Sequence, residues 1–241
     1  MIYFYSSETN INNFKSLKME FDRYLSRFGH YEFQPFSDRE AFEKHIKGKK
    51  KCLLILSSWH YRIIHKEYSL TPALAGTRDG KKYHKRVLVA KVEAPTIKSV
   101  VTGRIASASS IEHTRNVLTQ MLKEEFPADI VKILTVPKDI DALMSVGFGM
   151  SKSALTTRNA LNELKMVNPI LCQKMKILKE GEEALLLIIA VPEHFTKDAE
   201  PMVTNFKNMD TDPEGKEKIR MLGLDGWKEL DLSDKVKLEA E

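Results

Sequence analysis

The sequence predicts an α/β protein in which strands and helices alternate in two successive blocks. In residues 2–64, short apolar runs of strand length are each followed by a helical pattern with apolar residues on one face. A second block with the same alternation begins near Thr102. Such alternation is typical of mostly parallel sheets with helices on their faces.

The first block contains three predicted strands separated by amphipathic helices. The strands are apolar, aromatic or β-branched, and we expect them at 2–5, 31–36 and 52–56. The first helix ends at Gly29, because glycine is favoured just after the last helical turn. The second begins at a capping box of Ser37 and Glu40 and ends at Gly48.

The second block carries signals of the same kind. We expect its strands at 104–106, 129–136 and 153–155, with helices at 111–122, at 139–147 and after Thr157. A strand at 87–92 is expected to join the two blocks. Two further strands, at 175–178 and 184–191, are predicted to flank a turn at 180–182. The tail is predicted to be helical at 201–209 and at 213–222, where Gly223 ends the helix.

The turn at 107–110 is predicted to join a buried strand to an amphipathic helix. Ser109 and Glu112 fit a capping box that would start this helix. Backbone N–H groups and the positive end of the helix dipole would then face outward and form a pocket for a small polar or anionic group. The alternative is that these four small residues form only a tight, well-capped turn.

The composition is that of an ordinary soluble globular protein. The 241 residues, 42% hydrophobic and 29% charged, suffice for one large domain or two small ones. No run approaches the roughly 20 apolar residues that span a bilayer, and the opening MIYFYSSETN lacks the features of a signal peptide. We expect a cytoplasmic protein, or a periplasmic or membrane-associated one if an export signal has been removed ahead of Met1.

The net charge of +5 arises partly from two basic clusters, at 47–51 and 81–86. Neither cluster is interleaved with aromatic residues, so we interpret both as solvated loop charges and predict no nucleic-acid partner. Cys52 and Cys172 each lie beside apolar residues and are expected to be buried free thiols. A disulfide in an oxidising compartment is the alternative.

Motifs that carry catalysis or hold cofactors are missing from the sequence. It contains no G-x-S-x-G nucleophile elbow, no P-loop and no G-x-G-x-x-G dinucleotide motif. Neither the cysteines nor the histidines have the spacing of a metal site. We therefore predict a protein that is not an enzyme and that has no catalytic residue, no metal and no cofactor.

Polar and aromatic residues follow two strands of the first block, where ligands bind in parallel sheets. They are Ser6, Ser7 and Glu8 after the first strand, and Ser57, Ser58, Trp59, His60 and Tyr61 after the third. Aromatic side chains beside a pair of hydroxyls would supply stacking area and orienting hydrogen bonds. The alternative is that Trp59 packs under its own helix and that His60 is exposed.

Several segments together resemble the type II periplasmic-binding-protein superfamily. Within it, the chain is most similar to the phosphate- and phosphonate-type solute-binding proteins of ABC transporters. The segments are the serine turn after GRIA, TVPKDIDALMSVGFGMSKSALTT, the strand LLLIIAVPE and the tail DPEGKEKIRMLGLDGW. The resemblance covers nearly the whole chain, although none of these motifs is diagnostic by itself.

The resemblance implies a two-lobe clamp, each lobe a mostly parallel sheet flanked by helices, with two crossing strands as the hinge. Lobe 1 would comprise 1–88 and 190–241, and lobe 2 would comprise 89–189. The ligand would bind in the interlobe cleft, and the closed form would be presented to an ABC permease in the membrane. We expect the protein to act as a monomer.

The resemblance also implies which residues bind the ligand. In phosphonate binders, the turn corresponding to Ser107, Ser109 and Ser110 holds the anion with hydroxyls and helix N–H groups. The aromatic loop at 57–61 would face this turn. The loop at 6–9 would complete the wall of lobe 1, and the strand region around Thr156 would complete that of lobe 2.

The expected function is transport-linked binding of a small polar or anionic ligand, such as phosphate or a phosphonate. The sequence departs from the phosphonate pattern at Glu112, where a carboxylate in the first helical turn would compete with a bound dianion. A smaller anion, an amino-acid-like zwitterion and a heterocycle stay open as ligands. The alternatives from other classes are an enzyme on the same fold, such as a lyase or dehydratase, and a cytoplasmic ligand sensor.

Overall fold

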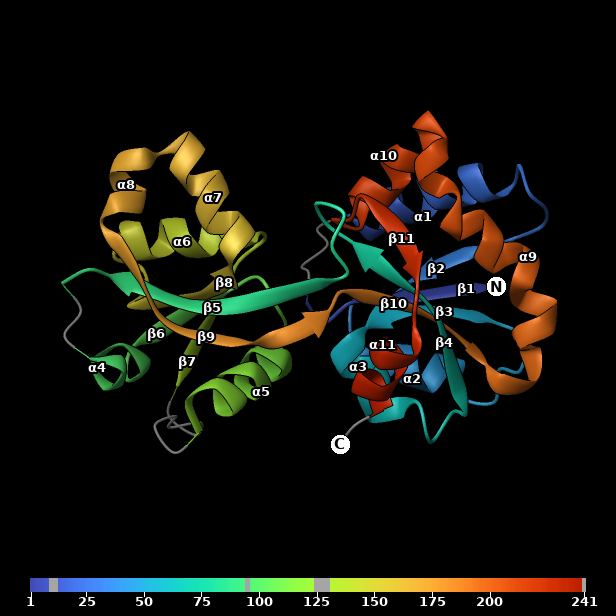
Figure 1. The fold of residues 1–241 in the computed structure, drawn as a ribbon, viewed down its shortest axis with the longest axis horizontal. Coiled ribbons are helices and arrows are strands. Elements are labelled where there is room, and N and C mark those ends of the chain that lie inside the picture. Colours follow the sequence, from blue (N-terminus) through green and yellow to red (C-terminus); the bar gives the residue numbers. More distant parts are fainter. Residues whose placement is uncertain (9–12, 94–95, 124–130, 240–241) are drawn as a thin grey trace. The chain divides into compact units, whose positions relative to one another are not determined.

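The computed structural model describes residues 1–8, 13–93, 96–123 and 131–239 (Figure 1). The chain forms two compact units. Unit 1 comprises Met1–Ser7, Ile11–Tyr83 and Leu185–Glu241, and unit 2 comprises Glu8–Asn10 and His84–Ala184. Each unit contains one mixed sheet flanked by helices, which confirms the predicted α/β fold with two lobes. No helix of the described residues is long and apolar enough to cross a membrane.

Unit 1 is built on a six-stranded sheet with the strand order β11-β4-β10-β3-β1-β2. The central strand β1 pairs in parallel with β2 and β3, as the alternation of the first block predicts, whereas β10 and β11 run antiparallel to their neighbours. The strands are β1 (Ile2–Tyr5), β2 (Phe33–Pro35), β3 (Leu53–Ser57), β4 (Leu70–Thr77), β10 (Leu187–Pro192) and β11 (Gly226–Glu229).

Helices cover both faces of this sheet, and successive side chains of β1 point into the cores on opposite faces. Ile2 and Phe4 enter one core with α1, α9 and α10, whereas Tyr3 and Tyr5 enter the opposite core with α2, α3 and α11. Both faces of the strand are therefore buried, which accounts for its continuous apolar sequence. The helices are α1 (Phe14–Leu25), α2 (Arg39–Ile46), α3 (Ser58–Ile64), α9 (Thr196–Lys207), α10 (Pro213–Met221) and α11 (Leu232–Glu239).

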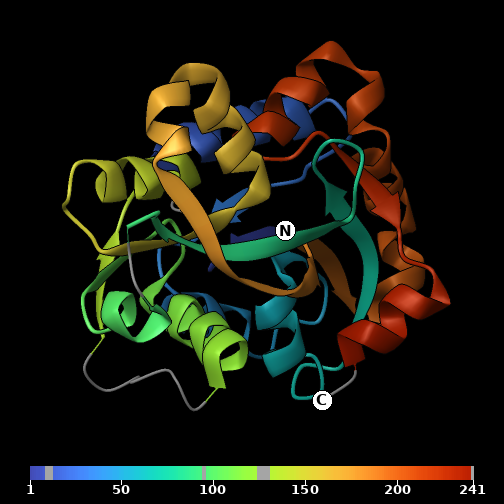
Figure 2. The ribbon, with the colours of Figure 1, turned by 60° about the vertical axis from the view of Figure 1, so that its left-hand side comes forward.

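Unit 2 contains a five-stranded sheet with the order β7-β6-β8-β5-β9. Strand β6 pairs in parallel with β7 and β8, and β5 runs antiparallel to β8. In Figures 1 and 2, β5 and β9 lie side by side as the two long strands of this sheet. The strands are β5 (Tyr83–Lys91), β6 (Arg104–Ser107), β7 (Lys132–Thr135), β8 (Ser153–Thr157) and β9 (Met175–Leu185). Residues 129 and 130 of the predicted strand 129–136 lie outside the described residues.

Two hydrophobic cores cover the faces of this second sheet. Leu88 and Ala90 of β5 pack with α5, whereas Val87 and Val89 pack with α6 and α7. This alternation of inward positions is the period of two that a strand buried on both faces requires. The helices are α4 (Ile97–Val101), α5 (Ile111–Leu122), α6 (Asp139–Gly147), α7 (Arg158–Val167) and α8 (Pro169–Gln173).

The predicted turn at 180–182 is wrong, because β9 continues through these residues. Gly181 has no positive φ, so its backbone does not need glycine for a turn. A Cβ at this position would instead lie 3.1 Å from the Met121 side chain and 3.4 Å from the Arg86 carbonyl oxygen. The glycine permits close packing against neighbouring elements, a role that the sequence alone does not distinguish from a turn.

Two strands of unit 1 were not predicted. β4 carries Pro72 and Gly76, which normally disfavour a strand, but its pairing with β10 shifts register beside Pro72. Gly76 leaves room for the Leu224 side chain, because a Cβ there would lie 2.5 Å from it. β11 lies beyond the last predicted helix, which Gly223 ends, and in the described sheet it is an edge strand that pairs with β4.

Both predicted capping boxes are displaced by one residue. Ser110, not Ser109, caps α5 by accepting the N–H of His113 at 3.2 Å. Asp38, not Ser37, caps α2 by accepting the N–H of Ala41 at 2.8 Å. In each case the residue after the predicted cap, Asp38 or Ser110, is also a favoured capping residue. Its extended backbone lets its side chain accept a backbone N–H of the first helical turn.

Candidate functional site

Three helices of unit 2 begin at the same edge of its sheet. β6 and β8 lead into α5 and α7, and the segment after β7 leads into α6. Because β7, β6 and β8 are parallel neighbours, their carboxyl ends meet at one edge, where open α/β sheets bind ligands. Helix N-termini carry unsatisfied N–H groups and partial positive charge, so this edge favours an anion.

The serine turn at this edge is held by hydrogen bonds among its own side chains. The Ser107 hydroxyl oxygen accepts the Ser109 N–H at 3.2 Å and the Thr114 hydroxyl at 2.9 Å. The Ser109 hydroxyl donates to the Glu8 carbonyl oxygen at 3.4 Å. Ser110 caps α5, which leaves Ile111 at the first helical position, where the N–H has no acceptor within the helix.

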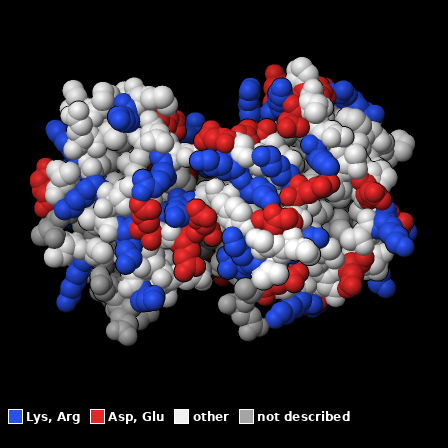
Figure 3. Space-filling model, viewed as in Figure 1, with Lys and Arg blue, Asp and Glu red and all other residues white. Residues whose placement is uncertain are grey.

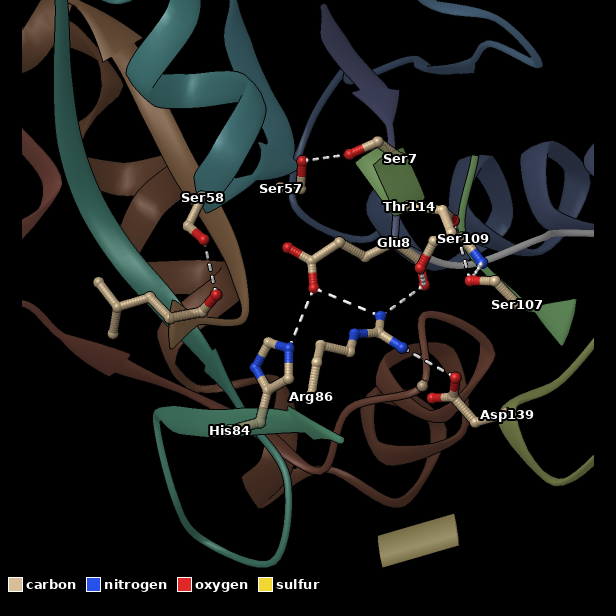
Figure 4. Close-up of polar contacts among 12 residues, drawn as sticks. Ser7, Glu8, Ser57, Ser58, His84, Arg86, Ser107, Ser109, Thr114 and Asp139 are labelled. Carbon is tan, nitrogen blue, oxygen red and sulfur yellow. Dashed lines mark hydrogen bonds and ion pairs between the residues drawn. The ribbon is translucent and has the colours of Figure 1, made fainter. Parts of the chain in front are cut away.

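A buried arginine stands beside this turn in Figure 4. Arg86 lies on β5 opposite Thr157, and its side chain is 8% exposed. Its Nη1 atom bonds Asp139 Oδ1 at 2.8 Å, and its Nη2 atom donates to the Glu8 carbonyl oxygen at 3.1 Å. The Glu8 carboxylate lies 3.6 Å from Nη2 and 3.1 Å from His84 Nε2. The Nε atom of Arg86 is buried and has no hydrogen-bond partner among the described residues.

The charges of this cluster perturb its titration strongly. Burial raises the pKa of the Glu8 carboxyl, but the hydrogen bond and charge of His84, with the charges of His113 and Arg86, outweigh burial and hold this pKa well below its ordinary value. Burial lowers the pKa of His113 to about 4, so this imidazole is neutral near pH 7. With His113 neutral, the carboxylates of Glu8 and Asp139 face the single guanidinium of Arg86 in this cluster.

Polar side chains also gather at the carboxyl ends of β1 and β3 in unit 1. The Ser7 and Ser57 hydroxyls are 2.7 Å apart, and Ser57 also caps α3 by accepting the His60 N–H at 3.3 Å. The Ser58 hydroxyl donates to the Leu185 carbonyl oxygen at 2.7 Å. Trp59 is partly buried beneath the guanidinium of Arg39, which lies 5.6 Å from the ring centre.

His60 and Tyr61 lie inside unit 1. The His60 ring is fully buried, and its Nε2 atom is 2.8 Å from Glu43 Oε1, so the alternative that it is exposed is wrong. Burial lowers the pKa of His60 to about 4 despite Glu43. Tyr61 is also fully buried, and its hydroxyl donates to the Leu70 carbonyl oxygen at 3.1 Å. Both side chains pack in the core of unit 1.

The predicted site residues of unit 2 come together, whereas in unit 1 the contact between predicted serines joins Ser7 and Ser57. Thr156 is buried, and its hydroxyl donates to the Asp139 carbonyl oxygen at 3.0 Å, next to Arg86. Ser6 is partly buried at the end of β1. Thr9, which ends the predicted loop 6–9, lies outside the described residues.

The sequence interpretation missed Arg86, His84, His113 and Asp139. The prediction that the basic cluster at 81–86 is solvated is wrong for Arg86, because its side chain is buried beside the carboxylates of Glu8 and Asp139. The strand predicted at 87–92 extends back to Tyr83, and the period of two then places His84 and Arg86 on the same face as Leu88. Extending the predicted strand by four residues toward its N-terminus would have placed His84 and Arg86 on this buried face.

No group of three or more histidine, cysteine, aspartate or glutamate side chains in the described ranges is placed to hold a metal ion. Cys52 and Cys172 are both free; Cys52 is buried as expected, whereas Cys172 is only partly buried.

A scan of family models matches residues 4–235 to the family "ABC transporter, phosphonate, periplasmic substrate-binding protein". The chain belongs to this family. The family consists of transporter binding proteins and not of enzymes, which confirms both the predicted resemblance and the predicted non-catalytic role. A search of curated proteins finds no match.

Several solved structures share the fold of this chain. XAC2383 from Xanthomonas citri, bound to chloride ion, is 12% identical with a TM-score of 0.73, covering 99% of this chain and 94% of that one. A binding protein component of an ABC phosphonate transporter from Pseudomonas aeruginosa is 11% identical with a TM-score of 0.68, covering 98% and 83%. PhnD1 from Prochlorococcus marinus, in complex with methylphosphonate, is 14% identical with a TM-score of 0.65, covering 99% and 95%. At such identities these likenesses concern the fold.

Proposed function

We propose that this member of the phosphonate-binding family takes a small anionic ligand, of the phosphonate or phosphate class, at the N-terminus of α5. The observation that carries this proposal is the turn at 107–110, which ends a parallel strand and places the Ile111 N–H at the start of a twelve-residue helix. Buried Arg86 next to this turn adds a guanidinium whose Nε–H has no partner among the described residues. Family membership and the methylphosphonate held by a protein of similar fold agree with this ligand class.

The charge balance of the site favours anions of low charge. The carboxylates of Glu8 and Asp139 already occupy the Nη atoms of Arg86, so a ligand meets a guanidinium that is largely neutralised. A monoanion therefore fits the site better than a dianion, because each further negative charge adds repulsion from the two carboxylates. Delivery to an ABC permease and a place outside the cytoplasmic membrane follow from the same proposal.

Titration calorimetry with methylphosphonate, phosphite, phosphate, sulfate and an amino acid is the test. The variant Ile111→Pro removes one N–H from the site, and proline is well tolerated at the first helical position. Ser110 already has the extended backbone that a residue before proline requires, with φ −57° and ψ 154°. Losing one hydrogen bond to a charged group costs about 1.5–3 kcal/mol, so affinity should fall at least about tenfold.

Ile111→Ala is the matched control, because it shortens the same exposed side chain and keeps the N–H. Its affinity should stay within about twofold of the parent protein. Equal affinity of Ile111→Pro and Ile111→Ala would show that the ligand does not use the start of α5. Failure of every anion in the panel to bind would contradict the proposed ligand class.

A further inference from the structure

Five large apolar side chains stand exposed on one corner of unit 2. Phe148 and Met150 follow α6, Met166 and Val167 end α7, and Ile170 lies in α8. Their exposed fractions lie between 57% and 80%. We call these five residues the apolar corner. Exposing such apolar side chains to water is unfavourable in free energy unless another surface covers them.

The packing of three helices brings these residues to the same corner. α7 contacts both α6 and α8, and the end of α6 abuts α8 so closely that a Cβ on Gly147 would lie 2.6 Å from the Leu171 side chain. Leu164 is buried beneath α7 while Met166 and Val167 point away from the core. In Figure 3 the surface over α7 and α8, at the upper left, is largely white.

The high exposure of these side chains indicates that they protrude. A side chain that lines a groove is shielded by the walls of the groove, whereas Met166 and Phe148 are 80% and 72% exposed. A protruding apolar group needs either a matching hollow on a protein partner or a soft medium that closes around it. The interfacial region of a lipid bilayer is such a medium and accepts apolar side chains without a preformed pocket.

Basic residues accompany the apolar corner. Lys152, Lys165 and Lys174 are exposed and lie one to four residues from its members in sequence. Glu163 is the sole acidic residue of the sequence between Ala142 and Lys179. A surface that combines protruding apolar groups with lysines complements an interface of acyl chains and anionic headgroups.

We propose that the apolar corner binds peripherally to membranes that contain anionic lipids. Met166, Val167 and Ile170 enter the interfacial region, and the lysines contact the headgroups. The chain belongs to a family that serves a membrane transporter, so a membrane surface is near the place where such a protein acts. Adsorption would hold the protein close to that surface, independently of which ligand it binds.

Co-sedimentation of the full chain with vesicles tests this proposal, using phosphatidylcholine alone and phosphatidylcholine mixed with phosphatidylglycerol. We expect binding to the mixed vesicles that weakens as salt is added. The double variant Met166→Ser and Ile170→Ser should reduce the partition coefficient at least about tenfold, because two inserted apolar side chains are lost. Lys165→Gln and Lys174→Gln should each reduce it about fivefold.

Leu232→Ser with Val236→Ser is the matched control, since these residues of α11 in unit 1 are similarly exposed, at 83% and 66%. Unchanged binding of this control, together with loss in the corner variant, supports the proposal. Equal loss in both variants, or absence of binding to the mixed vesicles, overturns it. Concentration-dependent self-association that only the corner variant abolishes, without vesicle binding, also overturns it and assigns the apolar corner to a second copy of the chain.

Discussion

Replacing Arg86 by methionine should be the most damaging change of charge in unit 2. The Arg86 and Glu8 side chains are each 8% exposed, and the Asp139 side chain is 19% exposed. Methionine retains much of the apolar stem but leaves both carboxylates without their guanidinium. Breaking a buried ion pair from one side costs about 3–5 kcal/mol, a large part of the roughly 5–15 kcal/mol that stabilises a protein domain.

Two companion variants separate the loss of charge from other effects. Glu8→Gln should cost less, about 1–3 kcal/mol, because Arg86 keeps its contacts with Asp139 and with the Glu8 carbonyl oxygen. Arg104→Met removes an exposed arginine from β6 of the same sheet and should change the free energy of unfolding by less than about 0.5 kcal/mol. The double variant of Glu8 and Arg86 should lose less than the sum of the single losses, because the two groups interact directly.

Urea unfolding near neutral pH provides the assay, with far-UV circular dichroism and tryptophan fluorescence recorded together. The two tryptophans, Trp59 and Trp227, both lie in unit 1, so fluorescence follows unit 1 and circular dichroism follows both units. Arg86→Met should shift the part of the dichroism transition that belongs to unit 2. A loss below about 1 kcal/mol would refute the view that Arg86 compensates buried carboxylates.

Acid titration of the same proteins tests the direction of the pKa shift of Glu8. The pKa of Glu8 is lowered in the folded state, so its stabilisation is present above the unfolded pKa of about 4.3 and is lost as the pH falls below that value. Glu8→Gln should therefore show a weaker fall of stability in acid than the parent protein. An unchanged acid profile would contradict the lowered pKa.

Three further predictions concern other sites. Gly215→Ala should destabilise unit 1 by at least about 1–3 kcal/mol in urea unfolding, because its Cβ would lie 2.2 Å from the Met209 carbonyl oxygen, whereas Lys216→Ala next to it should be neutral. The pKa values of His60 and His113 are lowered to about 4, so the unfolded chain binds more protons than the folded chain below about pH 6.5. The free energy of unfolding should therefore fall by up to about 3 kcal/mol per histidine between pH 6.5 and 4. If His60→Asn left the pH dependence of the free energy of unfolding unchanged, the prediction for His60 would be wrong. Burial raises the pKa of Cys52 to about 11, so Ellman's reagent near pH 8 should modify Cys172 readily and Cys52 only after unfolding; rapid reaction of two thiols in the native protein would show otherwise.

Local patterns determined much of the architecture. The run at 2–5 is apolar at every position, and such a run is stable only where helices cover both faces of a sheet, which is where β1 lies. The serine turn before α5 was predictable because small hydroxyl residues satisfy the first N–H groups of a helix within a few residues of sequence. Family membership also followed from the order of such segments, and the family model confirms it.

The tertiary structure alone decided which polar residues join that turn. Glu8, Arg86 and Asp139 are separated by more than fifty residues from one another, and only the pairing of β5 with β8 and the folding of the segment after β1 bring their charges together. Likewise, the sequence predicts a turn at Gly181, whereas in the structure this glycine lies in a strand with its Cβ position 3.1 Å from the Met121 side chain. Sequence periodicity reports which face of an element is buried, but the identity of the group across that face depends on contacts that sequence spacing does not encode.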